Sequence, residues 1–170
     1  MIKKRKAEIN IRALVFILLT VIWCGVIFAF SAQKADESSE TSGGVIYMTC
    51  RMTVSGFTDL SDAAREELIE SMQFRVRKAA HFTVYLILGV LSVQIFLAVG
   101  RPVLARNCAL SALGFCLLYA VSDELHQHFV PGRSCQFRDV CIDTAGAAVG
   151  ILISTAVFAL ISKNDRKLHT

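Results

Sequence analysis

Four long runs of residues almost without charge constrain the fold of this chain more than any other feature. Three of them cover 13–32, 79–99 and 140–162. At about 1.5 Å per residue, each can cross a hydrocarbon layer of about 30 Å as a helix. The fourth is too short by itself, so we expect it to extend over about 107–127 and to include polar residues at its end. The sequence therefore predicts an all-α membrane protein with four transmembrane helices.

The composition agrees with this class. Of the 170 residues, 54% are hydrophobic and 19% are charged, and the charge is segregated from the apolar runs, whereas soluble domains interleave the two. The basic start followed by an apolar run also resembles a secretory signal, but the apolar core of a signal has only about 7 to 15 residues. We therefore expect the first run to be retained as a helix. Disorder is excluded, and no nucleic-acid partner is expected because the basic flanks are short.

Basic residues flank the apolar runs on alternate sides. They precede the first run, lie between the second and third, and follow the fourth: Lys3, Lys4, Arg5, Lys6, Arg12, Arg101, Arg106, Lys163, Arg166 and Lys167. The positive-inside rule places such segments in the cytoplasm. We therefore predict a single multi-pass membrane domain over 1–170, with both termini cytoplasmic and an extracytoplasmic insertion at 33–77.

The insertion at 33–77 is the one sizeable polar segment. Gly43-Gly44 is expected to break it. Apolar residues recur at helical spacing in two later stretches, over 45–52 and over 68–76. Ser61 or Asp62 is a plausible N-cap for the later stretch. The pattern predicts short amphipathic helices on the outer surface. Whether they cover the bundle or only connect its helices stays open.

Polar groups in a membrane cost several kcal/mol unless they are paired, so their positions are informative. Under the predicted topology they gather at the outer ends of all four spans, whereas the cytoplasmic ends carry mainly Lys and Arg. We therefore predict a site in the outer leaflet. Its candidate residues are Ser31, Gln33, Lys78, His81, Tyr85, Asp123, Glu124, His126, Gln127, Arg133, Asp139 and Asp143.

Two local patterns position charged members of this set. Gly146 and Gly150 share a helix face with Asp143, and this small-xxx-small spacing allows a neighbouring backbone to approach, which would place the carboxylate inside the bundle. The stretch 130–133, Val-Pro-Gly-Arg, predicts a tight turn that holds Arg133 at the bundle mouth. Its guanidinium fork suits a phosphate or carboxylate.

Two interpretations of the site remain open. As a binding site, it would hold an anionic head group with Lys78 and Arg133, and Ser31, Gln33, Tyr85 and Gln127 would complete the ligand contacts. As an intramembrane enzyme, it would use His81, Asp123, Glu124 and His126 for catalysis, while Asp139 and Asp143, one helical turn apart, would hold a divalent metal ion.

Purely structural roles are the alternative for two of these residues. Arg133 could simply neutralise Asp123, Asp139 or Asp143, because buried carboxylates need a partner whether or not a ligand binds. His81 could hydrogen-bond Asp123 or Glu124 and do no more than join two helices.

The combined motifs resemble the VanZ-like family of bacterial membrane proteins. The residues that carry the resemblance are Ser31-Ala-Gln33, Arg77-Lys78-x-x-His81-Phe-x-x-Tyr85, Ser122-Asp123-Glu124-x-His126-Gln127-x-Phe129-Val-Pro131-Gly132-Arg133 and Asp139-Val-x-x-Asp143-x-x-Gly146-x-x-x-Gly150. The resemblance implies a small polytopic protein of the bacterial cytoplasmic membrane. The namesake of the family is associated with low-level resistance to teicoplanin, through a mechanism not established as catalysis.

We therefore expect a protein that contributes to envelope or glycopeptide tolerance. Its outer-leaflet site would bind a membrane lipid, a lipid-linked cell-wall precursor or a glycopeptide antibiotic. The alternative function is a metal-assisted hydrolase or transferase that acts on a lipid phosphate, ester or amide.

Overall fold

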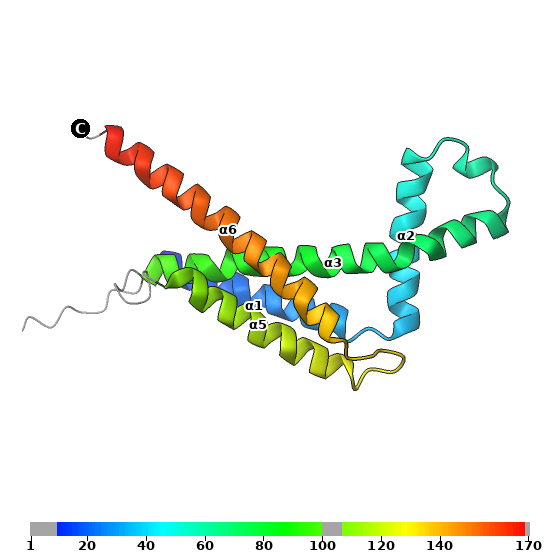
Figure 1. Cartoon of the computed structure of the whole chain (residues 1–170), viewed down its shortest axis with the longest axis horizontal. Coiled ribbons are helices and arrows are strands. Elements are labelled where there is room, and N and C mark those ends of the chain that lie inside the picture. Colours follow the sequence, from blue (N-terminus) through cyan, green and yellow to red (C-terminus); the bar gives the residue numbers. More distant parts are fainter. Residues whose placement is uncertain (1–9, 100–106, 169–170) are drawn as a thin grey trace, which may run out of the picture.

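The computed structural model describes residues 10–99 and 107–168, with side chains for 10–98 and 107–161. This part of the chain contains only helices: α1 (Ile11–Ser31), α2 (Ala35–Thr53), the short 3-10 helix η1 (Phe57–Asp59), α3 (Asp62–Val99), α5 (Cys108–Gln127) and α6 (Phe137–Leu168) (Figure 1). Of these, α1, α3, α5 and α6 are long and apolar enough to cross a membrane. The predicted all-α membrane class with four spans is confirmed. The basic residues at 3–6, 101 and 106 lie outside the described residues.

The four long helices pack together, and the C-terminal ends of α1 and α5 lie beside the middle of α3. The indole Nε1 of Trp23 donates to the carbonyl oxygen of Val84 at 2.8 Å, which joins α1 to α3. The hydroxyl of Tyr119 on α5 donates to the carbonyl oxygen of Cys24 on α1 at 2.7 Å. Farther along α3, the Nε2 of Gln94 donates to the Oγ of Ser154 on α6 at 2.7 Å. Polar bonds between helices thus fix the relative register of the bundle.

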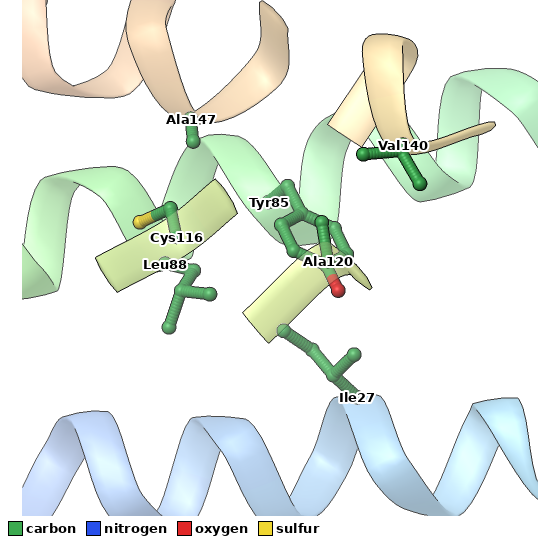
Figure 2. Close-up of a cluster of buried hydrophobic side chains, with 7 residues drawn as sticks. All are labelled: Ile27, Tyr85, Leu88, Cys116, Ala120, Val140 and Ala147. Carbon is green, nitrogen blue, oxygen red and sulfur yellow. The ribbon is translucent and has the colours of Figure 1, made fainter. Parts of the chain in front are cut away.

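The core lies where all four spans meet. Figure 2 shows that α5 and α6 contribute small or β-branched side chains there, while α3 contributes a large tyrosine. The cluster consists of Ile27, Tyr85, Leu88, Cys116, Ala120, Val140 and Ala147. Small side chains allow the backbones to approach closely, which is how helices associate in a bilayer.

Glycines bring the backbones of α3 and α6 into direct contact. A Cβ on Gly146 would lie 2.2 Å from the carbonyl oxygen of Phe82, and one on Gly150 would lie 2.0 Å from that of Leu86. The close approach predicted from this glycine spacing is confirmed. Asp143, which precedes the pair on the same helix, is accordingly 0% exposed.

The insertion differs from its prediction, because the expected break at Gly43-Gly44 is wrong. α2 continues through both glycines and crosses α3 (Figure 1). A Cβ on Gly43 would lie 3.6 Å from Nε2 of Gln73 and 3.8 Å from Cγ2 of Ile69, so the helices touch at this point. This contact offsets the cost of about 1 kcal/mol that each glycine imposes on a helix.

The helix predicted behind Ser61 is present but is not separate from the second span. Ser61 is its N-cap, since its Oγ accepts from the backbone N–H of Ala64 at 3.3 Å. α3 then runs for 38 residues without interruption, a length of about 57 Å against a hydrocarbon layer of about 30 Å. Its first half therefore extends beyond the bundle.

We call residues 35–77 the outer hairpin: α2, η1 and the first half of α3. The hairpin has a small core of its own, built from Ile46, Cys50 and Phe57 against the apolar side of α3. The backbone N–H of Ala35 donates to the carbonyl oxygen of Pro131 at 3.4 Å. The start of the hairpin is therefore tied to the turn between α5 and α6.

Candidate functional site

Polar side chains from all four spans meet at one end of the bundle, which we call the mouth. α1 ends there at Ser31, α5 ends there at Gln127, and α6 begins there with Asp139 and Asp143. α3 passes through and contributes His81. The structure thus brings together candidates that are far apart in the sequence.

A cavity of about 240 Å³ opens at the mouth. Its apolar wall comes from α1, α2 and α3, including Phe30, Val45 and Val84. Polar residues are also among its lining: Ser31, Gln33, Arg77, His81, Asp123 and Arg133. The surface of the cavity is therefore mainly apolar, and two arginines and one aspartate are among its lining residues.

The turn between α5 and α6 positions Arg133 as the sequence predicted. Gly132 has φ +76°, and the backbone N–H of Arg133 donates to the carbonyl oxygen of Val130 at 3.1 Å, which closes a turn that needs glycine at this position. A Cβ on Gly132 would also lie 2.8 Å from that of Ala35. The turn and the start of α2 are therefore packed without spare room.

The acceptors that Arg133 meets among the described residues are neutral. Its Nε donates to the carbonyl oxygen of Gln33 at 3.2 Å, and longer contacts of 3.5 Å reach Gln127 Oε1 and the carbonyl oxygen of Phe30. Among the described residues it forms no salt bridge, so the structure does not support the alternative in which Arg133 only neutralises Asp123, Asp139 or Asp143. Burial, and then the nearby charge of Arg77, lower the pKa of Arg133 from its ordinary value.

Lys78 does not line the cavity, although it was predicted to hold the head group beside Arg133. Its ammonium group donates to a carboxylate oxygen of Asp139 on α6. Arg77 lines the cavity in its place, together with His81 and Val84, at positions i, i+4 and i+7 of one helix face. The adjacent Arg-Lys pair was visible in the sequence, but periodicity alone did not reveal which of the two faces the cavity.

α2 supplies cavity residues that sequence reasoning did not find. Ser38, Thr41 and Ser42 line the cavity opposite the bundle. The sequence left open whether the insertion covers the bundle or only connects its helices. The cavity lining shows that the insertion covers part of the bundle, because α2 forms one side of the cavity.

His81 meets a different acid from the one expected. Its Nδ1 lies 3.4 Å from Oδ1 of Asp143, not beside Asp123 or Glu124. The close packing of α3 against α6 causes this pairing, since Asp143 is one turn before Gly146. Four buried oxygens have no hydrogen-bond partner among the described residues: both carboxylate oxygens of Asp143 and the hydroxyls of Tyr85 and Ser31. The floor of the mouth therefore holds several polar atoms that can accept or donate further bonds.

The remaining candidates on α5 serve different purposes. Gln127 Nε2 donates to Asp123 Oδ2 at 3.2 Å and orients that carboxylate at the cavity. Glu124 Oε2 accepts from the backbone N–H of Gln136 at 2.9 Å, which holds the connection to α6. The ring of His126 stacks on Phe28, with centroids 4.5 Å apart. Of the four candidate catalytic residues, only His81 and Asp123 line the cavity.

The donor set does not fit a metal centre. Asp139 and Asp143 lie one turn apart as expected, but their neighbours are Lys78 and His81 on α3. In the part of the chain that the structure describes, no three His, Cys, Asp or Glu side chains converge so as to hold an ion. Asp139 is therefore bonded to Lys78, and Asp143 lies beside His81.

The bundle and its mouth define a small multi-pass α-helical membrane protein with a mainly apolar cavity at one end of the spans. The VanZ/LLP1 family model matches residues 16–159, which cover most of the chain, so the protein belongs to this family. The resemblance predicted from the motifs is thereby confirmed. Membership is consistent with a membrane protein tied to glycopeptide resistance. No curated protein and no solved structure is significantly similar to the chain.

Proposed function

We propose that the protein contributes to envelope or glycopeptide tolerance by binding the anionic head group of a membrane amphiphile in the mouth cavity. One observation carries the proposal: Arg77 and Arg133 both line a cavity with an apolar wall, and neither forms a salt bridge among the described residues. Guanidinium groups match phosphate oxygens in geometry and charge. A lipid phosphate, such as the head of a lipid-linked cell-wall precursor, is the ligand class that this lining favours.

The size of the cavity limits what can enter. Its volume of about 240 Å³ is below the range of about 300–1,000 Å³ that holds drug-sized ligands. A head group or the end of one chain fits this space, and the rest of the amphiphile would remain in the leaflet. A whole glycopeptide antibiotic is much larger than the cavity, so only part of one, such as its acyl tail, would enter.

The orientation of the chain is part of the proposal. The positive-inside rule favours cytoplasmic termini and therefore an extracytoplasmic mouth in the bacterial cytoplasmic membrane. The arginines would then meet phosphate groups of the outer leaflet. Lys78 is not available for this role, because Asp139 already accepts its hydrogen bond.

A titration of the purified protein in detergent tests the proposal. The probes are a polyprenyl phosphate, the uncharged polyprenol and inorganic phosphate, with teicoplanin as a fourth. We expect saturable binding of the lipid phosphate and a loss of affinity of about 10- to 100-fold in Arg133→Gln and in Arg77→Gln, since one charge-assisted hydrogen bond contributes about 1.5–3 kcal/mol.

Arg75→Gln is the matched control, because Arg75 is exposed on α3, lies outside the cavity lining and carries the same charge. This variant should bind like the unaltered protein. Equal affinity for the phosphate and the alcohol, or an equal loss in Arg75→Gln, would contradict the proposal.

The enzymatic alternative has no specific observation in its favour. Glu124 and His126 are engaged away from the cavity, and the described acids do not converge on a metal site. The same titration, followed for products of the lipid phosphate, separates turnover from binding.

A further inference from the structure

α2 has three distinct faces along its length. Ser42, Ile46 and Cys50 form a buried face, on which Ile46 and Cys50 pack against apolar residues of α3. A second face follows the spacing 3, 4, 3, 4, which keeps its members on one side of a helix. It consists of Ser38, Thr41, Val45, Met48 and Met52.

The second face begins as a wall of the cavity and ends as an apolar surface. Ser38, Thr41 and Val45 line the cavity together with Phe30 of α1. Past the cavity, the same side of α2 presents Met48 and Met52, with exposed fractions of 54% and 75%. Val45 belongs to both parts and is 56% exposed.

The direction of this face follows from its cavity contacts. Phe30 is near the end of a membrane span and is 52% exposed on its apolar outer surface. A face of α2 that looks toward Phe30 therefore looks toward the layer that the spans occupy. Met48 and Met52 continue that face beyond the protein mass that encloses the cavity.

Charged residues occupy the third face of α2, on another side of the helix. Glu37, Glu40 and Arg51 are all exposed or partly exposed and follow one another at helical spacing, together with Gly44. An arrangement with one apolar side and one charged side is typical of a helix that lies in a membrane interface.

We propose that α2 is an interfacial helix, and that Val45, Met48 and Met52 bind the lipid surface of the leaflet at the mouth. The partner is the bilayer itself, and the face is continuous with the lipid-facing surface of the bundle through Phe30 and Val45. The cavity behind Val45 then opens sideways to lipid as well as to water. This inference rests on membrane insertion and not on the ligand of the cavity.

Tryptophan quenching in vesicles tests the proposal. The full chain is reconstituted in phosphatidylethanolamine–phosphatidylglycerol vesicles that contain a lipid brominated near its head group. Trp23 is the only tryptophan, so Trp23→Phe gives a background for Met48→Trp, Met52→Trp and the control Arg51→Trp. We expect the bromines to reduce emission by about half at positions 48 and 52 and to leave position 51 almost unchanged, as for a helix whose apolar face is buried about 5–10 Å deep. Equal quenching at position 51, or none at 48 and 52, would overturn the proposal.

Because Trp23 donates a hydrogen bond to α3, its replacement can impair folding. A second experiment keeps Trp23 and places a benzophenone amino acid at position 48 or 51 of the otherwise unaltered chain, in the same vesicles without bromine. Lipid adducts at position 48 and none at 51 support the proposal. Crosslinks from position 48 to a second copy of the chain, the absence of any adduct, or equal adducts at position 51 would refute it.

Discussion

Asp143 on α6 lies opposite His81 on α3, with Oδ1 3.4 Å from Nδ1, and both residues belong to the floor of the mouth. One turn farther along, Gly146 lies against the backbone of Phe82, the residue that follows His81. Backbone contact between the two helices therefore brings the carboxylate and the imidazole near each other. A displacement of α6 at Gly146 should therefore also move the carboxylate of Asp143 relative to the imidazole of His81.

Adding a methyl group at this contact should destabilise the bundle. Gly146→Ala and Gly150→Ala place a Cβ within 2.2 Å and 2.0 Å of a carbonyl oxygen of α3, which cannot move independently of its helix. We expect each variant to lose about 1–3 kcal/mol of unfolding free energy. The measurement is thermal or denaturant unfolding in detergent, followed by circular dichroism.

Gly25→Ala and Gly114→Ala are the controls for this series. Both glycines lie within helices, and an added Cβ would meet no neighbouring segment of the described chain within 4 Å. We expect these variants to be unchanged or to gain up to about 1 kcal/mol, because alanine favours helix. Equal losses at all four positions would contradict the packing explanation.

The pair formed by Lys78 and Asp139 should behave as a unit. Asp139 is only 6% exposed, so removal of one partner leaves the other charge largely desolvated. We expect Lys78→Met and Asp139→Leu each to cost about 3 kcal/mol, and the double variant to recover most of that loss. Unfolding measurements on the four proteins give the coupling free energy directly. Additive losses would show that the two residues do not act together.

Gly132→Ala should impair both stability and ligand binding. Its positive φ imposes a cost of about 1–2 kcal/mol on a residue with a side chain, and the new Cβ would lie 2.8 Å from that of Ala35. Displacing the turn moves Arg133 and loosens the start of α2. The expected result is a lower affinity for the polyprenyl phosphate, measured by titration in detergent.

Gly56→Ala is the matched control for the turn. Gly56 has nearly the same φ, +75°, but lies in the loop before η1 and meets only Asp59 at 3.9 Å. It should lose the stability that its positive φ costs, without the added close contact of Gly132, and it should retain ligand affinity. A parallel loss of binding in both variants would mean that reduced stability, and not the position of Arg133, explains the effect.

The predicted orientation can be tested with the exposed thiol of Cys135, which lies between α5 and α6. A membrane-impermeant maleimide should label it in intact cells, and Cys135→Ser should abolish that signal if Cys141→Ser is used as the background. Ile11→Cys, at the opposite end of the bundle and exposed, should react only after the cells are permeabilised. The reverse pattern would place the mouth in the cytoplasm.

The spans and the close approach of α3 to α6 could be predicted because both depend on local spacing. A span needs only a long apolar run. Gly146 and Gly150 mark a contact surface without any knowledge of the neighbour. The turn before Arg133 was also predictable, since Pro131-Gly132 restricts the backbone locally.

Partners across helices could not be predicted in the same way. Arg77 and Lys78 differ by about 100° around the helix axis, and the rotation of α3 against α6 decides which of them meets Asp139 and which meets the cavity. The sequence contains both residues but not that rotation. For the same reason, the sequence did not reveal that the acid beside His81 is Asp143 and not Asp123 or Glu124.

The path of α2 also depends on a contact between distant segments. Gly43-Gly44 favours a break when only the local chain is considered. The proximity of Gly43 to Ile69 and Gln73, which belong to the next long helix, is absent from any local window. This contact keeps the helix continuous and turns the insertion into a wall of the cavity.

Because α3 is one unbroken helix, the number of residues between the outer hairpin and the bundle determines the angle between them. α3 contains no proline, and its only glycine, Gly89, lies within the bundle. One residue inserted between Met72 and Val76 would turn everything before it by about 100° and lengthen the arm by about 1.5 Å. α2 would then swing away from Phe30, and the cavity would lose a side although every side chain of the mouth remained in place.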